Sequence, residues 1–335
     1  MSSPACEICG NTARNRVFTA REMMFGSRKP FDYLECHGCG CLQLLDVPDD
    51  LSSFYPDDYY SLADPPEIML PPGATTLRRA RAAALLHAPA YALDTCVNTS
   101  WVSSVLVPTE FMWLASLRLK TSSAVCDVGS GSGRILAWML SQGLSNLAGF
   151  DPYIEHDLNL GGRIAIRKLV VDDIPGCWDL IMLNHSFEHM PHPAKVLERL
   201  AMLLNDQGSI LIRIPVADSW AWRTYGVHWA QLDAPRHLFL HTQRSMSILA
   251  EQLGLTVSRV FFDSTSFQFW GSEQYKRDIP HRDPRSYGEN PNTDLFTADE
   301  IRRFHRRAQR MNRQGIGDSA GFVLQRQNSE AVAHA

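Results

Sequence analysis

Short apolar runs alternate with longer polar segments along most of the chain, most clearly between residues 120 and 262. Runs of a few residues predict seven buried strands. We expect the last two strands along the chain to form an antiparallel pair at the sheet edge. The seven candidates are residues 124–128, 146–150, 164–171, 178–184, 209–215, 255–262 and 321–324. Strands that alternate with helices predict an α/β fold with a Rossmann-like, seven-stranded, mostly parallel sheet.

Apolar residues that recur three and four positions apart predict the helices. These segments are residues 76–93, 110–119, 135–140, 194–204, 245–253 and 298–312. Residues 220–229 are instead crowded with aromatic side chains, including Trp220, Trp222 and Trp229. We expect this segment to be irregular and to contact a substrate, with a small satellite core as the alternative.

Alternating glycines follow the first strand candidate: Gly129, Gly131 and Gly133 come just after Asp127 and lead into a helix. Glycine lets the backbone approach a ligand closely, and the helix start offers free N–H groups to an anion. The third glycine comes one position too early for the dinucleotide fingerprint, and Arg134 occupies the expected place. The loop therefore predicts an anion site that differs from a pyrophosphate site.

Asp151 ends the second strand candidate, where an acid can accept hydrogen bonds from both hydroxyls of a ribose. Loop and acid together predict a ligand with a ribose and an anionic group but no pyrophosphate. S-adenosylmethionine fits, with its carboxylate at the loop and its ribose at Asp151. A glycine turn beside a surface aspartate is the structural alternative.

Two Cys-x-x-Cys pairs near the N-terminus, each followed by a glycine, predict a structural zinc site. The four thiols belong to Cys6, Cys9, Cys36 and Cys39. Residues 16–19 and 31–35 lie between the pairs and predict the strands of a zinc ribbon. His37 and Cys41 are alternative ligands.

Composition narrows the function classes. The 335 residues carry a formal net charge of −4, which gives no general attraction to nucleic acid or to anionic membranes. No apolar run reaches the ~18 residues of a membrane span and no signal-peptide pattern opens the chain, so we expect a cytoplasmic protein without membrane contact. The one basic cluster is the arginine-rich helix over 298–312, inside a long connection over 272–317.

The ordered motifs at 127–133, 149–151 and 178–189 resemble those of class I S-adenosylmethionine-dependent methyltransferases. A zinc ribbon ahead of such a domain is similar to the sugar C-methyltransferases that act on nucleotide-linked deoxysugars, and to methyltransferases of polysaccharide gene clusters. The resemblance implies S-adenosylmethionine and zinc as cofactors. It also implies that Asp172 or Asp173 binds the adenine amino group, with an exposed turn as the alternative, and Asn184 completes the predicted cofactor set.

Residues 184–192 follow the fourth strand candidate and contain three histidines and a glutamate. Methyl transfer to a protonated acceptor needs a base, and a histidine beside a carboxylate suits that role. We predict His189 as the base with Glu188 in support. The alternatives are a merely structural pair, His185 as the reactive imidazole, or a divalent metal on Glu188 and His189. The metal alternative is implied by a resemblance to the Glu-His pair of ubiquinone-pathway O-methyltransferases, although Asn184 replaces an expected acid.

Two further segments carry candidate catalytic residues. Asp233–Leu240 resembles a segment of the polysaccharide-pathway enzymes; within it, His237 is the second candidate base and Arg236 is a candidate partner for a phosphate or carboxylate. An aromatic and acidic cluster over 51–60 predicts a wall of the substrate pocket, with Tyr59 or Tyr60 near the reacting group. An aromatic contact that joins the ribbon to the main domain is the alternative.

The predicted organisation is a zinc ribbon over 1–47, an aromatic segment, linker and helix over 48–97, and a methyltransferase domain over 98–328. The predicted function is methyl transfer to a small molecule, most specifically a nucleotide-activated sugar or polysaccharide precursor. Carbon and oxygen acceptors both remain open, as does the oligomeric state. The alternatives are an RNA-modifying enzyme or a nucleic-acid-binding module that uses the ribbon, and, more weakly, a nicotinamide oxidoreductase.

Overall fold

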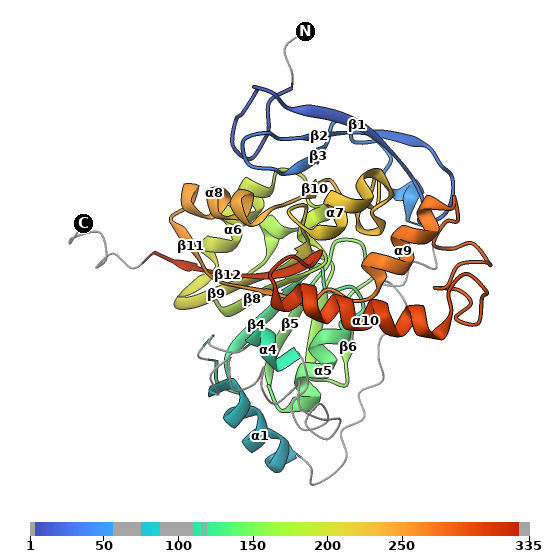
Figure 1. The fold of residues 1–335 in the computed structure, drawn as a ribbon. Coiled ribbons are helices and arrows are strands. Elements are labelled where there is room, and N and C mark those ends of the chain that lie inside the picture. The colour runs from blue at the N-terminus through green and yellow to red at the C-terminus, as the bar shows by residue number, and fades with distance from the viewer. Residues whose placement is uncertain (1–3, 56–74, 88–109, 115–116, 118, 328–335) are drawn as a thin grey trace. The chain divides into compact units, whose positions relative to one another are not determined.

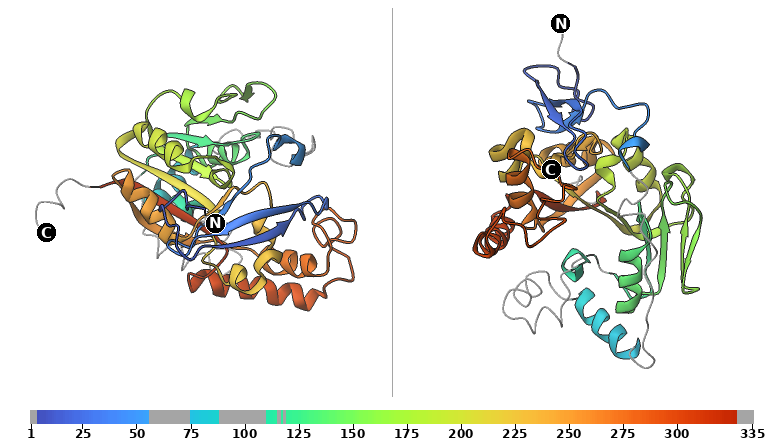
Figure 2. Two further views of the ribbon diagram at one scale, coloured as in Figure 1. Left: turned by 90° about the horizontal axis from the view of Figure 1, so that it is seen from above. Right: turned by 90° about the vertical axis from the view of Figure 1, so that its right-hand side faces the viewer.

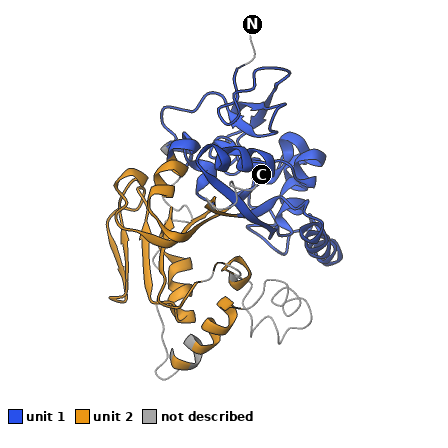
Figure 3. Cartoon of the chain, turned by 90° about the vertical axis from the view of Figure 1, so that its left-hand side faces the viewer, with its two compact units in different colours: residues 1–56, 185–195, 213–322 blue, residues 57–184, 196–212, 323–335 orange. Residues whose placement is uncertain are grey.

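The computed structural model describes residues 4–55, 75–87, 110–114, 117 and 119–327. The chain divides into two compact units, coloured blue and orange in Figure 3. Unit 1 comprises residues 1–56, 185–195 and 213–322, and unit 2 comprises residues 57–184, 196–212 and 323–335. Each unit is therefore assembled from several separate stretches of the chain.

Unit 2 is built on parallel strands. The central strand β4 pairs in parallel with β5 and β8, with Val125 opposite Leu147 on one side and Leu180 on the other. Strand β7 continues the sheet in parallel, and the short β6 returns antiparallel to it. The bounds are β4 Ala124–Val128, β5 Asn146–Phe150, β6 Leu158–Leu160, β7 Ile164–Arg167 and β8 Trp178–Asn184.

The helices of unit 2 bury one apolar face each. Helix α5 buries Leu136, Ala137, Met139 and Leu140, and its Trp138 ring lies 5.5 Å from that of Phe111 in α4. The helix bounds are α1 Thr75–His87, α4 Glu110–Leu114, α5 Arg134–Gln142 and α6 Pro193–Met202, the last of which also includes residues of unit 1.

The eight strands of the large sheet follow the order β11-β12-β9-β8-β4-β5-β7-β6. The remaining members are β9 Leu204–Pro215, β11 Leu255–Phe262 and β12 Ser319–Arg326. The predicted mixed α/β methyltransferase fold with a mostly parallel sheet is confirmed. The sequence predicted seven strands and missed β6, because three residues are too few for a periodic signal. The candidate at 164–171 is shorter than predicted, since β7 ends at Arg167 and Val171–Asp173 form a 3-10 turn.

Unit 1 contains a second, antiparallel sheet in the order β1-β2-β3-β10. Strands β1 and β2 form a long ribbon, dark blue in Figures 1 and 2, with Arg16 opposite Glu35 at one end. Strand β10 comes from far along the chain and pairs Phe239 with Gln43 of β3. The bounds are β1 Arg16–Arg21, β2 Pro30–Glu35, β3 Leu42–Leu44 and β10 Phe239–Leu240.

The helices of unit 1 include two that the sequence did not predict, Trp220–Tyr225 (α7) and Phe267–Lys276 (α9). Residues 220–229 were expected to be irregular, but Trp220–Tyr225 form helix α7, because the Ser219 side chain accepts a hydrogen bond from the Trp222 N–H at the helix start. The 3-10 turns Gly226–His228 and Ala230–Leu232 follow. The other helices are α8 Gln243–Gln252, α9 Phe267–Lys276 and α10 Ala298–Arg313. Within the described residues, no helix is both long and apolar enough to span a membrane.

Arg236 is fully buried in unit 1, and its guanidinium is hydrogen-bonded to other groups of the protein. Its guanidinium donates to Asp233 at 2.5 and 3.0 Å, to Glu22 at 3.1 Å and to the Phe54 carbonyl at 3.1 Å. The expected pairing with a substrate phosphate or carboxylate is thus replaced by two internal carboxylates. Removal of either carboxylate would therefore leave buried charge less well compensated.

A buried carboxyl makes the stability of the protein depend on pH. Asp318 is fully buried; one of its oxygens accepts from the Trp229 indole N–H at 2.9 Å, and burial raises its pKa from 3.8 to about 6. A raised carboxyl pKa lowers stability as the pH rises from about 4 to about 6. We expect Asp318→Asn to match the wild type in unfolding free energy at pH 4 and to exceed it by up to ~3 kcal/mol at pH 7. Urea denaturation at both pH values checks this, and a difference that does not vary with pH would contradict it.

Candidate functional site

The glycine loop of unit 2 has the predicted strand–loop–helix geometry. Gly129, Gly131 and Gly133 all have positive φ, at 74°, 52° and 81°, which other residues rarely adopt. The loop runs from the end of β4 to the start of α5. Near it, the hydroxyls of Ser130 and Ser132 are buried, and neither has a hydrogen-bond partner among the described residues. Buried hydroxyls without partners are the groups that a polar ligand satisfies.

Asp151 is buried beside the loop and accepts hydrogen bonds from the backbone N–H groups of Gly131 and Tyr153, both at 2.8 Å. A carboxylate has about four acceptor positions, so these bonds orient it and leave capacity for two hydroxyls. The geometry fits the predicted ribose contact.

The other predicted cofactor residues divide into two groups. Asp127 is buried and accepts a hydrogen bond from the Asn184 amide at 3.1 Å, which joins the ends of β4 and β8. Asp172 and Asp173 are exposed in the turn after β7. An exposed pair can reach a ligand but has no fixed geometry, so an adenine contact by either residue stays a prediction.

Gly133 provides a direct test of the loop. A Cβ at this position would lie 2.2 Å from Ile166 Cδ1 and 2.9 Å from Leu160 Cδ1. We expect Gly133→Ala to weaken S-adenosylmethionine binding by about 10-fold to 100-fold, because the loop must move and its strain costs about 1–3 kcal/mol. Calorimetric titration measures the affinity. Gly162→Ala is the matched control, since Gly162 also has positive φ but its Cβ would meet nothing within 4 Å. Equal affinities in the two variants would contradict a role for the loop.

In unit 1, Glu188 is surrounded by imidazoles. The side chain is fully buried, and neither of its oxygens has a hydrogen-bond partner among the described residues. The Nδ1 atom of His185 lies 3.5 Å from Oε1. Burial acts to raise the pKa of this carboxyl, but His185, His189 and His237 outweigh it and lower the pKa to about 2. Glu188 is therefore an ionised carboxylate.

His189 is held through its Nδ1. Its Nδ1 lies 2.8 Å from the Arg236 carbonyl oxygen and 3.1 Å from the Tyr55 hydroxyl. Because a carbonyl oxygen only accepts hydrogen bonds, we assign a proton to Nδ1, so that in the neutral imidazole Nε2 carries the lone pair. This tautomer suits a proton acceptor.

His237 is held in the same manner, with its Nδ1 2.8 Å from the Gln231 carbonyl oxygen. Its ring centroid lies 4.8 Å from that of His189, and burial lowers its pKa to about 4. Ligand atoms of Glu188, His189 and His237 lie within 4.8 Å of one another. The two candidate bases are therefore members of one cluster, whose spacing also satisfies the distance requirement for a metal ion.

The aromatic segment supplies a residue that the sequence did not single out. Tyr55 contacts His189, with ring centroids 6.2 Å apart in addition to the hydroxyl contact. The predicted candidates Tyr59 and Tyr60 lie outside the described residues. His185, the rival imidazole, is partly exposed and adopts φ 51°, a strained value for a residue other than glycine. The one available signal for Tyr55 was its place inside the predicted cluster over 51–60.

The two Cys-x-x-Cys pairs with their following glycines, residues 6–10 and 36–40, form two knuckles whose four thiols converge in unit 1. The Sγ atoms of Cys6 and Cys39 are 3.7 Å apart, and those of Cys9 and Cys36 are 3.4 Å apart. Four thiolates around zinc at about 2.3 Å would be about 3.8 Å apart, so the spacing fits. All four sulfur atoms lie within 4.8 Å of one another, and none forms a disulfide.

The two knuckles share one backbone geometry. The Gly10 N–H donates to the Cys6 carbonyl and the Gly40 N–H donates to the Cys36 carbonyl, each at 2.8 Å. Both glycines have positive φ, at 71° and 77°. The alternative ligands do not join the cluster: His37 is exposed, and the Cys41 thiol is directed at the Leu42 carbonyl. Two equivalent turns around four thiols suggest a zinc site.

A family model described as "Methyltransferase domain" matches residues 108–260. This match supports a class I S-adenosylmethionine-dependent methyltransferase domain over this part of the chain, in agreement with the sheet and the glycine loop. The methyltransferase fold also supports S-adenosylmethionine as the cofactor.

Individual relatives match over shorter stretches. The ubiquinone biosynthesis O-methyltransferase of Dechloromonas aromatica (strain RCB) is 26% identical over 116 residues, which is 31% of this chain and 50% of that protein. The enzyme of the same name from Ralstonia nicotianae is 25% identical over 114 residues, 31% of this chain and 48% of that protein. The chain thus spans about half the length of the curated relatives it matches. The crystal structure of the mycolic acid cyclopropane synthase CmaA1, complexed with SAH and CTAB, is 14% identical with a TM-score of 0.44, covering 77% of this chain and 99% of that one.

Proposed function

We propose that the protein transfers a methyl group from S-adenosylmethionine to a small-molecule acceptor. The observation that carries this proposal is the positive-φ glycine loop with the Asp151 carboxylate fixed beside it, inside the matched methyltransferase stretch. S-adenosylmethionine would supply the methyl group on a sulfonium that leaves as a neutral thioether. Asp151 would hold the ribose, the loop would hold the carboxylate, and Asp172 or Asp173 would hold the adenine amino group.

The proposed catalytic group is the cluster of Glu188, His189 and His237. His189 accepts the proton of the acceptor at Nε2, because its Nδ1–H is already committed to the Arg236 carbonyl. The ionised Glu188 stabilises the imidazolium that results, and no arginine or lysine neutralises it within the described residues. His237 lines the same cluster as a neutral imidazole. Tyr55 positions His189, while Tyr60 stays a sequence-based candidate.

The acceptor class that we propose is a nucleotide-activated sugar or a polysaccharide precursor. This choice rests on the likeness to sugar C-methyltransferases at the sequence level, and it leaves attack by carbon or oxygen open. We further propose the domain boundaries 1–47, 48–97 and 98–328, structural zinc on the four cysteines, and a cytoplasmic location.

Mass spectrometry tests the proposal directly. The protein is incubated with methyl-labelled S-adenosylmethionine and a panel of nucleotide-sugars, and the products are fragmented. We expect one sugar to gain one labelled methyl group, at a carbon or an oxygen that the fragments identify. Cofactor binding without transfer to any sugar would contradict the acceptor class, and transfer to tRNA or rRNA would favour the RNA-modifying alternative.

Treatment with a chelator distinguishes a metal-free base at His189 from the alternative in which the cluster binds a metal ion. If His189 acts as a metal-free base, turnover survives EDTA as long as the structural zinc is retained. Loss of turnover that returns on addition of Mg²⁺ or Mn²⁺ would instead show that Glu188, His189 and His237 hold a cation. Metal content measured in the same samples reports whether the cysteine site has stayed loaded.

A further inference from the structure

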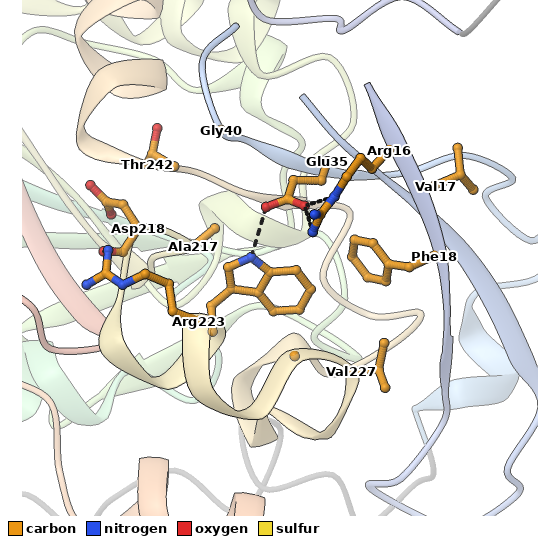
Figure 4. Close-up of a pocket in the computed structure, with 12 residues that line it drawn as sticks. Arg16, Val17, Phe18, Glu35, Gly40, Ala217, Asp218, Arg223, Val227 and Thr242 are labelled. Atoms are coloured by element: carbon orange, nitrogen blue, oxygen red, sulfur yellow. Dashed lines mark hydrogen bonds and ion pairs between the residues drawn. The ribbon is translucent and has the colours of Figure 1, made fainter. Parts of the chain in front are cut away.

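Unit 1 contains a pocket of about 900 Å³. Its walls come from β1, from the Cys36–Gly40 knuckle and from α7 with the turn that follows it (Figure 4). The volume is within the range of small-molecule sites, which is about 300–1,000 Å³. None of the catalytic or cofactor candidates lines it. The pocket is therefore a separate feature that requires its own explanation.

One wall of the pocket is apolar and partly open. The Trp222 and Phe18 ring centroids lie 4.9 Å apart; Trp222 is only 9% exposed, so the half-buried Phe18 supplies most of the accessible aromatic surface. Val17 and Val227 also line the pocket and are 51% and 36% exposed, unusually high for large aliphatic side chains. An exposed apolar patch with a polar rim is typical of a binding site. Figure 4 shows Phe18 and Val227 on one side of the pocket, with Asp218 and Arg223 on the other.

The polar groups are held in place before any ligand binds. Glu35 accepts from the Trp222 indole N–H at 3.3 Å through one oxygen and from Arg16 at 2.8 Å through the other. Arg223 donates to the Asp218 carbonyl at 3.0 Å. Preformed polar groups around an aromatic wall lose little entropy on binding.

Asp218 has an unused acceptor. Its Oδ2 accepts hydrogen bonds from the backbone and side-chain N–H groups of Gln243, both at 3.1 Å. Its Oδ1 is buried and has no partner within the part of the chain that the structure describes. A buried carboxylate oxygen without a partner costs free energy unless a donor reaches it. A ligand hydroxyl is such a donor.

The charges of the residues that line the pocket indicate which class of ligand it binds. The two arginines, Arg16 and Arg223, are balanced by the two carboxylates, Glu35 and Asp218, so the formal charge of the lining is zero. A phosphate would prefer uncompensated arginines, and a purely apolar ligand would leave Asp218 without a donor. A neutral ring with hydroxyl groups on its edge and C–H groups on its face meets both requirements, because the C–H face packs on aromatic rings.

We propose that this pocket binds a neutral sugar unit, with its face on Phe18 beside Trp222 and a hydroxyl donating to Asp218. Its role in holding the sugar part of the acceptor rests on the proposed function, whereas binding itself needs neither S-adenosylmethionine nor turnover. The ribbon thereby gains a recognition role beyond its structural one.

Calorimetric titration of the full-length, zinc-loaded protein tests the pocket. The probes are the neutral oligosaccharides maltotetraose, cellotetraose, mannotetraose and chitotriose, with UDP and a heparin tetrasaccharide as anionic comparators. We expect at least one neutral probe to bind, and Asp218→Asn to weaken it 10-fold or more. Arg303→Ala is the matched control, since Arg303 is exposed on α10 outside the pocket, and it should leave the affinity within 2-fold.

Val227→Glu is the second variant, because Val227 is partly exposed and its replacement fills the pocket without disturbing the core. It should also weaken binding at least 10-fold. Binding of anionic probes alone, no binding of any neutral probe, or unchanged affinity in both variants would overturn the proposal. Methyl transfer to a sugar without glycan binding would overturn the proposed pocket and leave the proposed function standing. Glycan binding without methyl transfer to any sugar would support the pocket and contradict the proposed acceptor class.

Discussion

Replacement of Cys36 by alanine is expected to abolish zinc binding and to unfold the N-terminal ribbon. The four sulfur atoms lie within 4.8 Å of one another, so removal of one ligand leaves three thiols that cannot complete a tetrahedral site. Structural zinc contributes its binding energy to folding, and loss of a metal is among the few changes that cost about 4 kcal/mol or more. Elemental analysis and thermal denaturation measure the two effects.

The destabilisation should spread beyond the ribbon. The Thr242 hydroxyl donates to the Cys39 carbonyl at 2.6 Å and also accepts from the Ser245 N–H at the start of α8. A loosened knuckle removes a partner from this helix cap, and such caps contribute about 1 kcal/mol. Hydrogen exchange should therefore increase in the first turn of α8 as well as in β1 and β2.

Cys177→Ser is the control, because Cys177 is exposed and lies outside the cysteine cluster. It should keep its metal and melt with the wild type. If Cys36→Ala retained zinc, or melted at the same temperature as the control, the four cysteines would not form the structural site that we propose.

Replacement of His189 by alanine is expected to lower kcat about 100-fold to 10,000-fold, the usual contribution of a positioned proton acceptor. Binding of S-adenosylmethionine should be unchanged, because the residues that we propose for the cofactor are Asp151 and the glycine loop. The variant also removes one hydrogen-bond partner of the Arg236 carbonyl and of the Tyr55 hydroxyl, so a folding check by circular dichroism accompanies the kinetics. Single-turnover methyl transfer with labelled cofactor gives the rate of the chemical step.

His305→Ala controls for the loss of an imidazole, since His305 is exposed on α10. A true base leaves a second signature: added imidazole should restore part of the activity of His189→Ala and none in the control. Full turnover in His189→Ala with intact cofactor binding would show that the base lies elsewhere, and His237→Ala is then the next variant to measure.

Features whose chemistry is local could be predicted from the sequence. The alternating glycines need positive φ, and the structure provides it at all three. Each cysteine pair is a short turn with its own glycine, so the spacing alone predicted two equivalent knuckles. Strand β8 has the predicted bounds, because a continuous apolar run ends sharply at Asn184.

Features that depend on distant partners could not be predicted in this way. Helix α7 was missed because its aromatic residues show no helical period, and its start depends on the Ser219 cap. The sequence named His189 and His237 as rival bases, 48 positions apart, but nothing local indicates that their rings meet. Tyr55 was passed over for Tyr59 and Tyr60, since neighbouring tyrosines are alike until one of them finds a partner.

By itself, the sequence determined the fold class, the glycine loop with its acid, and the two cysteine knuckles, because each rests on backbone conformations and ligand spacings within a few residues. Only the tertiary structure decided that β10 completes the ribbon sheet, that Glu188, His189 and His237 form one cluster, and that Glu35 and Trp222 meet at a pocket. The physical reason is that burial and hydrogen bonding between distant residues depend on how whole elements pack, and packing leaves no periodic signal along the chain.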